Sequence, residues 1–224
     1  MKNGYRHELK YLISRASAEL LRRRLPHFMG RDPHAGPTGK YTIRSLYFDD
    51  FYGSAMEEKE SGLAMRTKYR LRCYNYDLSF VKLERKEKHD SLTKKAAQTL
   101  SRQEALALQA LEADPGATGL KLELQNKLRW EALRPRVLVD YDRTPVVCAD
   151  GNTRITLDED LRTRPYCADL EAPATAMIPV LAPEQVILEV KFDDFLPGYL
   201  AQTLADIPKA PMAISKFTLC MQFL

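Results

Sequence analysis

Charged side chains alternate with uncharged ones along two successive segments of this chain. In residues 64–74 the basic residues Arg66, Lys68, Arg70 and Arg72 occupy every second position. Residues 81–88 follow the same pattern, with charged residues at positions 82, 84, 86 and 88. Because successive side chains of a β-strand point to opposite faces, this period predicts two neighbouring strands that share one charged face.

The alternation allows two interpretations of that face. Half-buried strands normally point apolar residues inward and polar residues outward, so a solvated sheet face is the ordinary interpretation. The more specific interpretation is a closed barrel whose interior is lined with charged side chains. Strand faces that mix Arg or Lys with an occasional carboxylate recur near residues 8, 44, 70, 84, 154 and 189. Charges of this density need either bulk water or a polyanion with its metal ion, since burying an unpaired ion is costly.

The remaining pattern predicts a single α+β domain over residues 1–224, built round an antiparallel β-barrel of about eight strands with flanking helices. Ser14 is expected to cap a helix over 15–27, and Ser101 with Glu104 forms a capping-box signature for a helix near 102–112. Strands are expected at 5–13, 40–49, 64–74, 81–88, 136–141, 154–160 and 185–192. Further helices are expected at 51–61, 120–133, 200–207 and 216–224.

Several classes of function are disfavoured by what the sequence lacks. Its net charge of +4 is modest for a nucleic-acid-binding protein, and Tyr74 and Tyr76 beside basic residues leave single-stranded nucleic acid only as a minor alternative. Walker, HExxH, GxSxG and Rossmann motifs are absent, and the histidines show no ligand spacing. The cysteines have no zinc-type spacing, and no segment approaches the roughly 20 apolar residues of a membrane span. We therefore expect a cytoplasmic protein with reduced thiols.

Eight sequence blocks resemble those of the polyphosphate-polymerase (VTC, vacuolar transporter chaperone) domain of the triphosphate tunnel metalloenzyme superfamily. They occur in the family's order and span nearly the whole chain. The blocks are Arg6-His-Glu-Leu-Lys-Tyr11, Ser45-Leu-Tyr-Phe-Asp49, Lys68-Tyr-Arg-Leu-Arg-Cys-Tyr74, Leu83-Glu-Arg-Lys86, Tyr141-Asp-Arg143, Arg154-Ile-Thr-Leu-Asp158, Leu188-Glu-Val-Lys191 and Ser215-Lys-Phe217.

The resemblance implies a tunnel barrel that binds ATP and threads a growing polyphosphate chain. It implies ATP-dependent polyphosphate synthesis by phosphoryl transfer, with Mn²⁺ or Mg²⁺ as the cofactor. Glu189, assisted by Glu8, would hold the metal, and the catalytic residues would be Arg70, Arg72, Lys86 and Glu189. The phosphate-binding residues implied by position are Lys10, Arg44, Arg70, Arg72, Lys86, Arg143 and Lys216. The resemblance adds three further cations of the tunnel lining, Lys82, Arg154 and Lys191, and one acid beside them, Glu84.

The chain also departs from the family pattern. Triphosphatases of the superfamily typically begin with Glu-x-Glu-x-Lys, whereas Arg6 stands here where the first Glu would be. That favours the polymerase branch, because a more cationic entrance suits a long anion. The regulatory SPX domain and membrane helices of the eukaryotic complex are absent, which allows for a separately encoded membrane partner that would place the protein at the inner face of a membrane.

Two alternatives stay open beside the polymerase. One is a tunnel enzyme of another kind, a triphosphatase that hydrolyses tripolyphosphate or a nucleoside triphosphate, or a nucleotidyl cyclase. The other is a non-catalytic module that binds polyphosphate or an inositol phosphate. Glu189 distinguishes an enzyme from a binding module and favours the enzyme, because a binding module needs cations but has little use for a metal-holding carboxylate. The ordinary interpretation of Glu189 and Lys191 is a cross-strand salt bridge on a solvated face. Oligomeric state, product length and acceptor are not predicted by the sequence.

Overall fold

In a computed structural model of the chain, residues 7–54, 65–89, 92–164, 168–207 and 210–224 are described. They divide into two compact units. Unit 1 comprises residues 1–42, 141–161 and 179–215, and unit 2 comprises residues 43–140, 162–178 and 216–224. Each unit has a core of its own. Among the described helices, none is long and apolar enough to cross a membrane.

The strands of both units follow one hydrogen-bonded order, β1-β10-β8-β7-β3-β4-β5-β6, with β2 beside β7 and β9 beside β8. Unit 1 contains β1 (His7–Ser14), β2 (Gly30–Arg31) and β10 (Gln185–Phe192). Unit 2 contains β4 (Met65–Tyr74), β5 (Asp77–His89) and β6 (Leu92–Leu100). The strands with residues in both units are β3 (Tyr41–Asp49), β7 (Arg134–Cys148), β8 (Thr153–Arg164) and β9 (Ile178–Pro179).

This arrangement confirms the predicted α+β class with a mainly antiparallel sheet and flanking helices. Within the described residues, however, the hydrogen-bonded order has two ends, β1 and β6, so it does not close into the ring of a barrel. The expectation of a single domain is neither confirmed nor contradicted by the division into two units.

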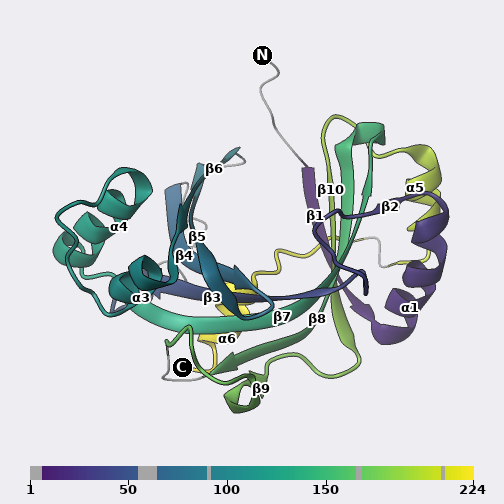
Figure 1. The fold of residues 1–224 in the computed structure, drawn as a ribbon. Coiled ribbons are helices and arrows are strands. Elements are labelled where there is room, and N and C mark those ends of the chain that lie inside the picture. Colours follow the sequence, from purple (N-terminus) through teal and green to yellow (C-terminus); the bar gives the residue numbers. More distant parts are fainter. Residues whose placement is uncertain (1–6, 55–64, 90–91, 165–167, 208–209) are drawn as a thin grey trace. The chain divides into compact units, whose positions relative to one another are not determined.

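In unit 1, α1 (Arg15–Arg24) and α5 (Gly198–Thr203) contribute to a core with β1, β8 and β10, and Figure 1 shows both helices beside these strands. The predicted N-cap is confirmed, because the Ser14 hydroxyl accepts from the Ser17 backbone N–H at 3.1 Å. Short 3₁₀ turns in this unit are η1 (Leu25–His27) and η2 (Asp150–Asn152). The core residues of β1, β8 and β10 occupy alternate positions, which leaves the charged side chains on the other face.

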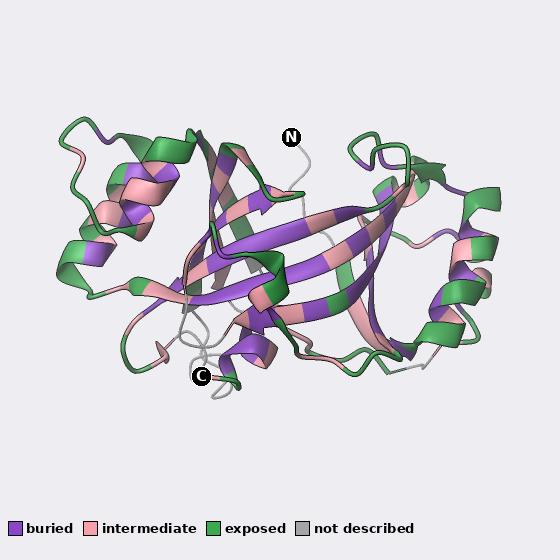
Figure 2. Ribbon diagram, turned by 60° about the horizontal axis from the view of Figure 1, so that its bottom comes forward, coloured by how far each residue is buried: buried purple, intermediate pink, exposed green. Residues whose placement is uncertain are grey.

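In unit 2, α3 (Arg102–Gln109) and α4 (Gly119–Trp130) pack against β5 and β6. The capping box predicted at Ser101 and Glu104 is confirmed in both of its hydrogen bonds. The short helix α6 (Lys216–Met221) and the 3₁₀ turn η3 (Ala174–Ala176) complete the described elements. Leu71, Leu83 and Leu124 are among the fully buried residues of this core, and Figure 2 shows buried and half-buried positions alternating along the strands.

Three segments differ from the expected elements. Residues 92–100 form β6, although their sequence shows no clean alternation, because pairing with β5 outweighs their weak local preference. The strand β7 runs without a break through Pro145 to Cys148, beyond the strand expected at 136–141. The helix expected at 51–61 lies largely outside the described residues.

Candidate functional site

The alternating charges of the two basic segments share one face of unit 2. In the antiparallel pair β4–β5, Lys68 lies opposite Lys86, Arg70 opposite Glu84, and Arg72 opposite Lys82. Because directly opposite residues of a pair point to the same side of a sheet, all six belong to one face, as predicted. We call this set, Lys68, Arg70, Arg72, Lys82, Glu84 and Lys86, the cationic face.

Glu84 is the carboxylate of the cationic face, and two arginines hold it. Its Oε2 accepts from Arg70 Nε at 2.6 Å and lies 2.5 Å from Arg70 Nη2, whereas Arg72 Nη1 is 3.5 Å from Oε1. Burial opposes ionisation of Glu84, but the charges of Arg70 and Arg72 outweigh it, and the pKa of Glu84 lies below its usual value. A negative charge is therefore maintained among these cations, where an anionic ligand would compete with it.

Residues of three further elements of unit 2 adjoin the cationic face. On β3, Tyr47 lies opposite Arg70, and the Arg70 Nη1 donates to its hydroxyl oxygen at 2.8 Å. On β6, Lys95 lies opposite Lys86 and extends the row of lysines to a third strand. On α6, the Phe217 ring packs 5.1 Å from the Tyr47 ring, between centroids, and 4.1 Å from Lys68 Nζ. The predicted residue Lys216 precedes Phe217 in the same helix.

Arg44, which was predicted to bind phosphate, does not belong to the cationic face. It lies opposite Cys73 in the β3–β4 pair, so its side chain points to the other side of the sheet from Arg70 and Arg72. Arg44 is 2% exposed and forms a bidentate pair with Asp140, with Nε to Oδ1 at 2.9 Å and Nη2 to Oδ2 at 2.7 Å. Its Nη1 donates to the carbonyls of Leu170 and Ala172. These contacts occupy the guanidinium, so we leave Arg44 out of the phosphate-binding set.

In unit 1, the predicted residues of β1, β8 and β10 form rows across the paired strands. One row contains Glu8, Lys191 and Arg154, and the neighbouring row contains Lys10, Glu189 and Thr156. Asp158 follows Arg154 and Thr156 on the same face of β8, and it binds Arg143 of β7. We call the predicted residues of this set, Glu8, Lys10, Arg143, Arg154, Glu189 and Lys191, the mixed face.

Carboxylates of the mixed face are paired with cations on neighbouring positions. Glu8 Oε1 lies 2.9 Å from Lys10 Nζ, and Glu189 pairs with Lys191 through Oε1. Burial and the charge of Glu189 both oppose ionisation of Glu8, but Lys10 and Lys191 outweigh them, and the pKa of Glu8 lies below its usual value. Glu189 is 4% exposed, so it is not part of an ordinary salt bridge on a solvated face.

Arg143 is buried and bridges two carboxylates of unit 1. Its guanidinium binds Asp158 bidentately, with Nε to Oδ1 at 2.6 Å and Nη2 to Oδ2 at 2.7 Å, and Nη2 also lies 3.4 Å from Glu189 Oε2. Burial disfavours the charged form, but Asp158 more than offsets this, and the pKa of Arg143 is raised. Arg143, which was predicted to bind phosphate, therefore contacts both Asp158 and the predicted metal-holding residue Glu189. Arg154, by contrast, is held by Asp32 at 2.7 Å and by the Tyr41 hydroxyl at 3.1 Å.

The donor set of the mixed face suits a divalent ion that also binds phosphate. Glu189 is close enough for its charge to oppose ionisation of Glu8, and the hydroxyl of Thr156, opposite Glu189, is buried without a hydrogen-bond partner in the described part of the chain. Mg²⁺ is usually held by one or two carboxylates together with substrate phosphates and water. The described residues contain no group of three or more His, Cys, Asp or Glu that could hold a metal ion.

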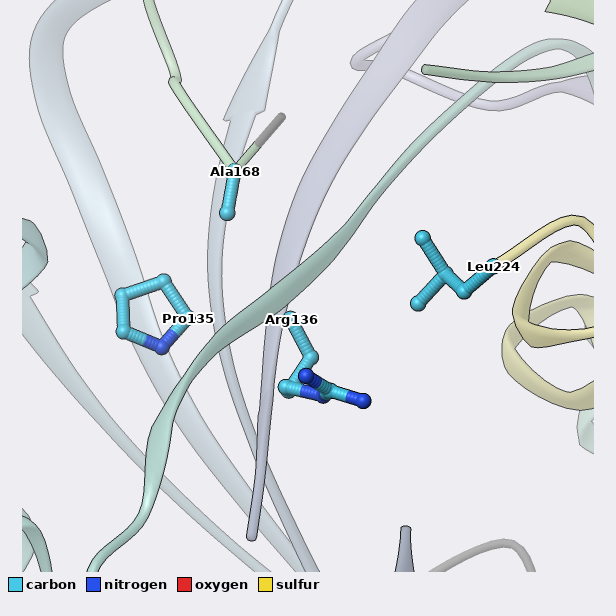
Figure 3. A pocket seen from close by; sticks show the side chains of 4 residues that line it. All are labelled: Pro135, Arg136, Ala168 and Leu224. Carbon is cyan, nitrogen blue, oxygen red and sulfur yellow. The ribbon is translucent and has the colours of Figure 1, made fainter. Parts of the chain in front are cut away.

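Two pockets lie in unit 2. A pocket of about 330 Å³ is lined by Pro135, Arg136, Ala168 and Leu224, and none of these four was predicted as a site residue (Figure 3). The other, of about 640 Å³, has Arg44 and Tyr76 among its lining residues, with the Arg44 guanidinium 4.6 Å from the Tyr76 ring centroid. The predicted charged residues, Arg44 apart, belong to strand faces and to α6 and not to these pockets.

The structure adds three residues that sequence reasoning did not assign to a site. Lys95 lies in a stretch without alternation, so only its pairing with Lys86 reveals it. Asp158 shares a face with Arg154 in the sequence pattern, but its partner Arg143 is fifteen residues away and is apparent only from the fold. Tyr47 occupies an alternate position of a predicted strand, and nothing in its spacing distinguishes it from a packing residue.

Comparison with solved structures shows the fold. The chain is similar to a Bacillus halodurans protein described as a "putative adenylate cyclase", with a TM-score of 0.51 and 16% sequence identity. The alignment covers 89% of this chain and 85% of the other. No curated protein matches the sequence significantly.

Comparison with protein families is more specific. The family model described as the VTC domain matches residues 5–224, nearly the whole chain. The resemblance inferred from the eight sequence blocks is thereby confirmed. The chain belongs to the VTC domain family.

Proposed function

We propose that this protein synthesises polyphosphate, by transferring the terminal phosphoryl group of ATP to an acceptor phosphate with a divalent ion bound. The observation that carries the proposal is the presence, in a VTC domain, of a cationic face suited to phosphate together with two carboxylates, the buried Glu189 and the exposed Glu8, suited to a metal. Phosphoryl transfer asks the protein mainly for positioning and charge neutralisation, so no nucleophilic side chain is needed.

The residues of unit 2 would bind phosphate oxygens. Arg72, Lys82 and Lys86 supply positive charge on one face, and Lys216 adds a further cation from α6. Arg70 is oriented by Glu84 and Tyr47, which fixes its guanidinium relative to the strand. Guanidinium groups bind phosphate with directed hydrogen bonds, whereas the ammonium of lysine acts as a compact charge.

The residues of unit 1 would hold the metal ion and further phosphate. Glu189 and Glu8 are the proposed ligands, Arg143 with Asp158 keeps Glu189 in place, and Lys10, Arg154 and Lys191 are proposed to bind phosphate. When bound, Mn²⁺ or Mg²⁺ would neutralise the phosphate charge that develops during transfer. The carboxylate pair argues against a purely binding module, which would gain nothing from the buried Glu189 and a second acid, Glu8, beside its cations.

The test is incubation of the purified protein with ATP and Mn²⁺ or Mg²⁺, followed by gel separation of the products. Long polyphosphate together with ADP is the expected result. Release of orthophosphate alone would overturn the polymerase in favour of a triphosphatase, and cyclic nucleotide would indicate a cyclase. Binding of tripolyphosphate without turnover under any metal would indicate a binding module.

A polymerase of this kind would act in the cytoplasm on ATP and polyphosphate, and not on nucleic acid. A separately encoded membrane protein is proposed as a partner that would receive the product. Co-purification of the tagged protein from a membrane fraction, compared with a Glu189→Gln variant that keeps its fold, would test whether such a partner exists.

A further inference from the structure

Tyr47 continues the cationic face onto a third strand. It lies opposite Arg70 in the β3–β4 pair, so the row Arg70–Glu84 of β4 and β5 extends to Tyr47 of β3. The residues on either side of it, Leu46 and Phe48, are buried in the core of unit 2. The alternation of β3 therefore directs the Tyr47 side chain to the charged side of the sheet.

The hydrogen bond with Arg70 determines which way the hydroxyl proton of Tyr47 points. A guanidinium has only donors, so in the 2.8 Å contact from Arg70 Nη1 the Tyr47 oxygen must be the acceptor. The hydroxyl proton is then directed elsewhere. In the described part of the chain, no protein group accepts it. The face therefore includes a donor without an assigned acceptor, beside a cation.

The surroundings of Tyr47 strengthen this donor. Burial opposes ionisation of the phenol, but the charges of Arg70 and Arg72 outweigh it and Lys216 adds to them, so the pKa of Tyr47 lies below its usual value. A more acidic hydroxyl donates a stronger hydrogen bond, above all to an anion. The Tyr47 ring is held in place by its contact with Phe217 of α6. The donor is thus both activated and fixed in position.

We propose that Tyr47 binds phosphate directly, by donating its hydroxyl proton to an oxygen of the phosphate chain that occupies the cationic face. This inference rests on the function proposed above, because it requires the face to bind phosphate. It assigns to β3 a neutral donor that takes part in recognition beside the arginines of β4. A neutral donor adds directed hydrogen bonding without adding to the repulsion among the cations.

Ser45 gives β3 a second hydroxyl on the same face. It lies opposite Arg72 and is buried, and its Oγ has no hydrogen-bond partner in the described part of the chain. The Arg72 Nε is likewise buried without such a partner. Buried polar groups are normally satisfied, and a departure from this rule calls for an explanation. An ordered phosphate oxygen or water beside β3 would supply the acceptor that both donors lack.

The experiment measures the affinity of the full chain for inorganic tripolyphosphate by calorimetry, without metal. Tyr47→Phe removes the hydroxyl and keeps the ring against Phe217. We expect this variant to bind about 10-fold to 100-fold more weakly, the usual effect of losing a hydrogen bond to a charged group. Tyr69→Phe is the matched control, because Tyr69 occupies the opposite face of β4, where its hydroxyl binds Glu123. That control should bind within about threefold of the native chain.

A second comparison separates direct contact from an effect through Arg70. In an Arg70→Ala background, Tyr47→Phe should still weaken binding if the hydroxyl contacts the anion. Loss of the Tyr47→Phe effect in that background would show that Tyr47 only positions Arg70, and would overturn the inference. Native-like affinity of the single variant Tyr47→Phe would overturn it as well.

Failure of this inference can be told apart from failure of the proposed function. If the native chain does not bind tripolyphosphate, the proposed function fails and the inference with it. If the native chain binds and Tyr47→Phe binds equally, the inference alone fails. Should Tyr47→Phe not fold, 3-fluorotyrosine placed at position 47 gives a second readout. Its fluorine resonance should shift when tripolyphosphate is added, and an unchanged resonance would contradict direct contact.

Discussion

On the cationic face of unit 2 one carboxylate, Glu84, lies among five cations, whereas on the mixed face of unit 1 two carboxylates, Glu8 and Glu189, lie among four. Glu84 is held by arginines in the position that a phosphate would take. Glu189 is buried beside Glu8, where two acids can share a metal ion. Under the proposed function, the same residue type would compete with the ligand on one face and recruit its counter-ion on the other.

The two units also each bury one bidentate arginine–aspartate pair, and the surroundings of the pairs differ. Arg143 belongs to the mixed face, and besides its partner Asp158 it contacts Glu189. Arg44 and Asp140 lie on the side of the sheet away from the cationic face, with loop carbonyls as further acceptors. The same kind of pair thus adjoins a predicted metal-holding residue, Glu189, in unit 1, whereas in unit 2 its further contacts are to loop carbonyls.

The largest effect is expected at the carboxylate pair. Glu189→Gln removes a proposed metal ligand without changing the side-chain size, and should reduce metal-dependent turnover of ATP to background, since the metal supplies several kcal/mol of transition-state stabilisation. Glu19→Gln, an exposed acid of α1, is the control and should keep full activity. Full turnover by Glu189→Gln in a product assay would refute the metal role of Glu189.

The buried Arg44–Asp140 pair of unit 2 should contribute to the stability of the fold and not to phosphate binding. Arg44→Met leaves Asp140, which is 0% exposed, as a buried charge without its partner, and should lower the free energy of unfolding by about 3–5 kcal/mol. Urea unfolding followed by circular dichroism measures this change. Tripolyphosphate affinity of the folded variant should stay near the native value. A stable variant with weakened tripolyphosphate binding would instead support the role for Arg44 that the sequence predicted.

A somewhat smaller effect is expected from one arginine of the cationic face. Arg72→Ala should cost on the order of 2–4 kcal/mol of transition-state stabilisation, by analogy with the loss of an oxyanion-binding donor. Arg85→Ala is the matched control, because Arg85 lies on the opposite face of β5 and binds Glu123. Steady-state rates of both variants measure this difference, and equal losses would mean that the two faces of the β4–β5 pair do not differ in function.

The smallest effect is expected at Glu84, and it should be opposite in sign for binding and for stability. Glu84→Gln removes the competing anion, so tripolyphosphate should bind more tightly, while the free energy of unfolding at neutral pH should fall by about 1 kcal/mol. Because the folded-state pKa of Glu84 is lowered, its contribution to stability is present above the unfolded pKa, near 4.3, and is lost as pH falls through the folded value.

The pH dependence of the unfolding free energy measures the contribution of Glu84 to stability. The difference in unfolding free energy between the native chain and Glu84→Gln should be largest at neutral pH and should shrink as the pH is lowered through the acidic range. Urea titrations at pH 7 and pH 3.5 measure it. Weaker tripolyphosphate binding by Glu84→Gln would show that the carboxylate orients Arg70 for the ligand more than it competes with the ligand.

The sequence by itself determined which side chains share a face within each strand. Alternation placed Arg70 with Arg72 and Lys82 with Glu84, and it placed Glu189 with Lys191, because a strand turns successive side chains to opposite sides whatever its neighbours are. The order of the sequence blocks was sufficient to identify the family.

Only the tertiary structure decided which of those faces belong together. Arg44 shares its strand face with Leu46 and Phe48, and the pairing of β3 with β4 shows that this face lies on the core side, away from Arg70. Lys95 joins the lysine row although its own segment lacks a pattern. The contact of Arg143 with Glu189 and that of Arg70 with Tyr47 likewise depend on strands that are distant in sequence. Periodicity is a local property of the chain, whereas register and pairing are set by hydrogen bonding and core packing between segments, so the first can be deduced from sequence and the second cannot.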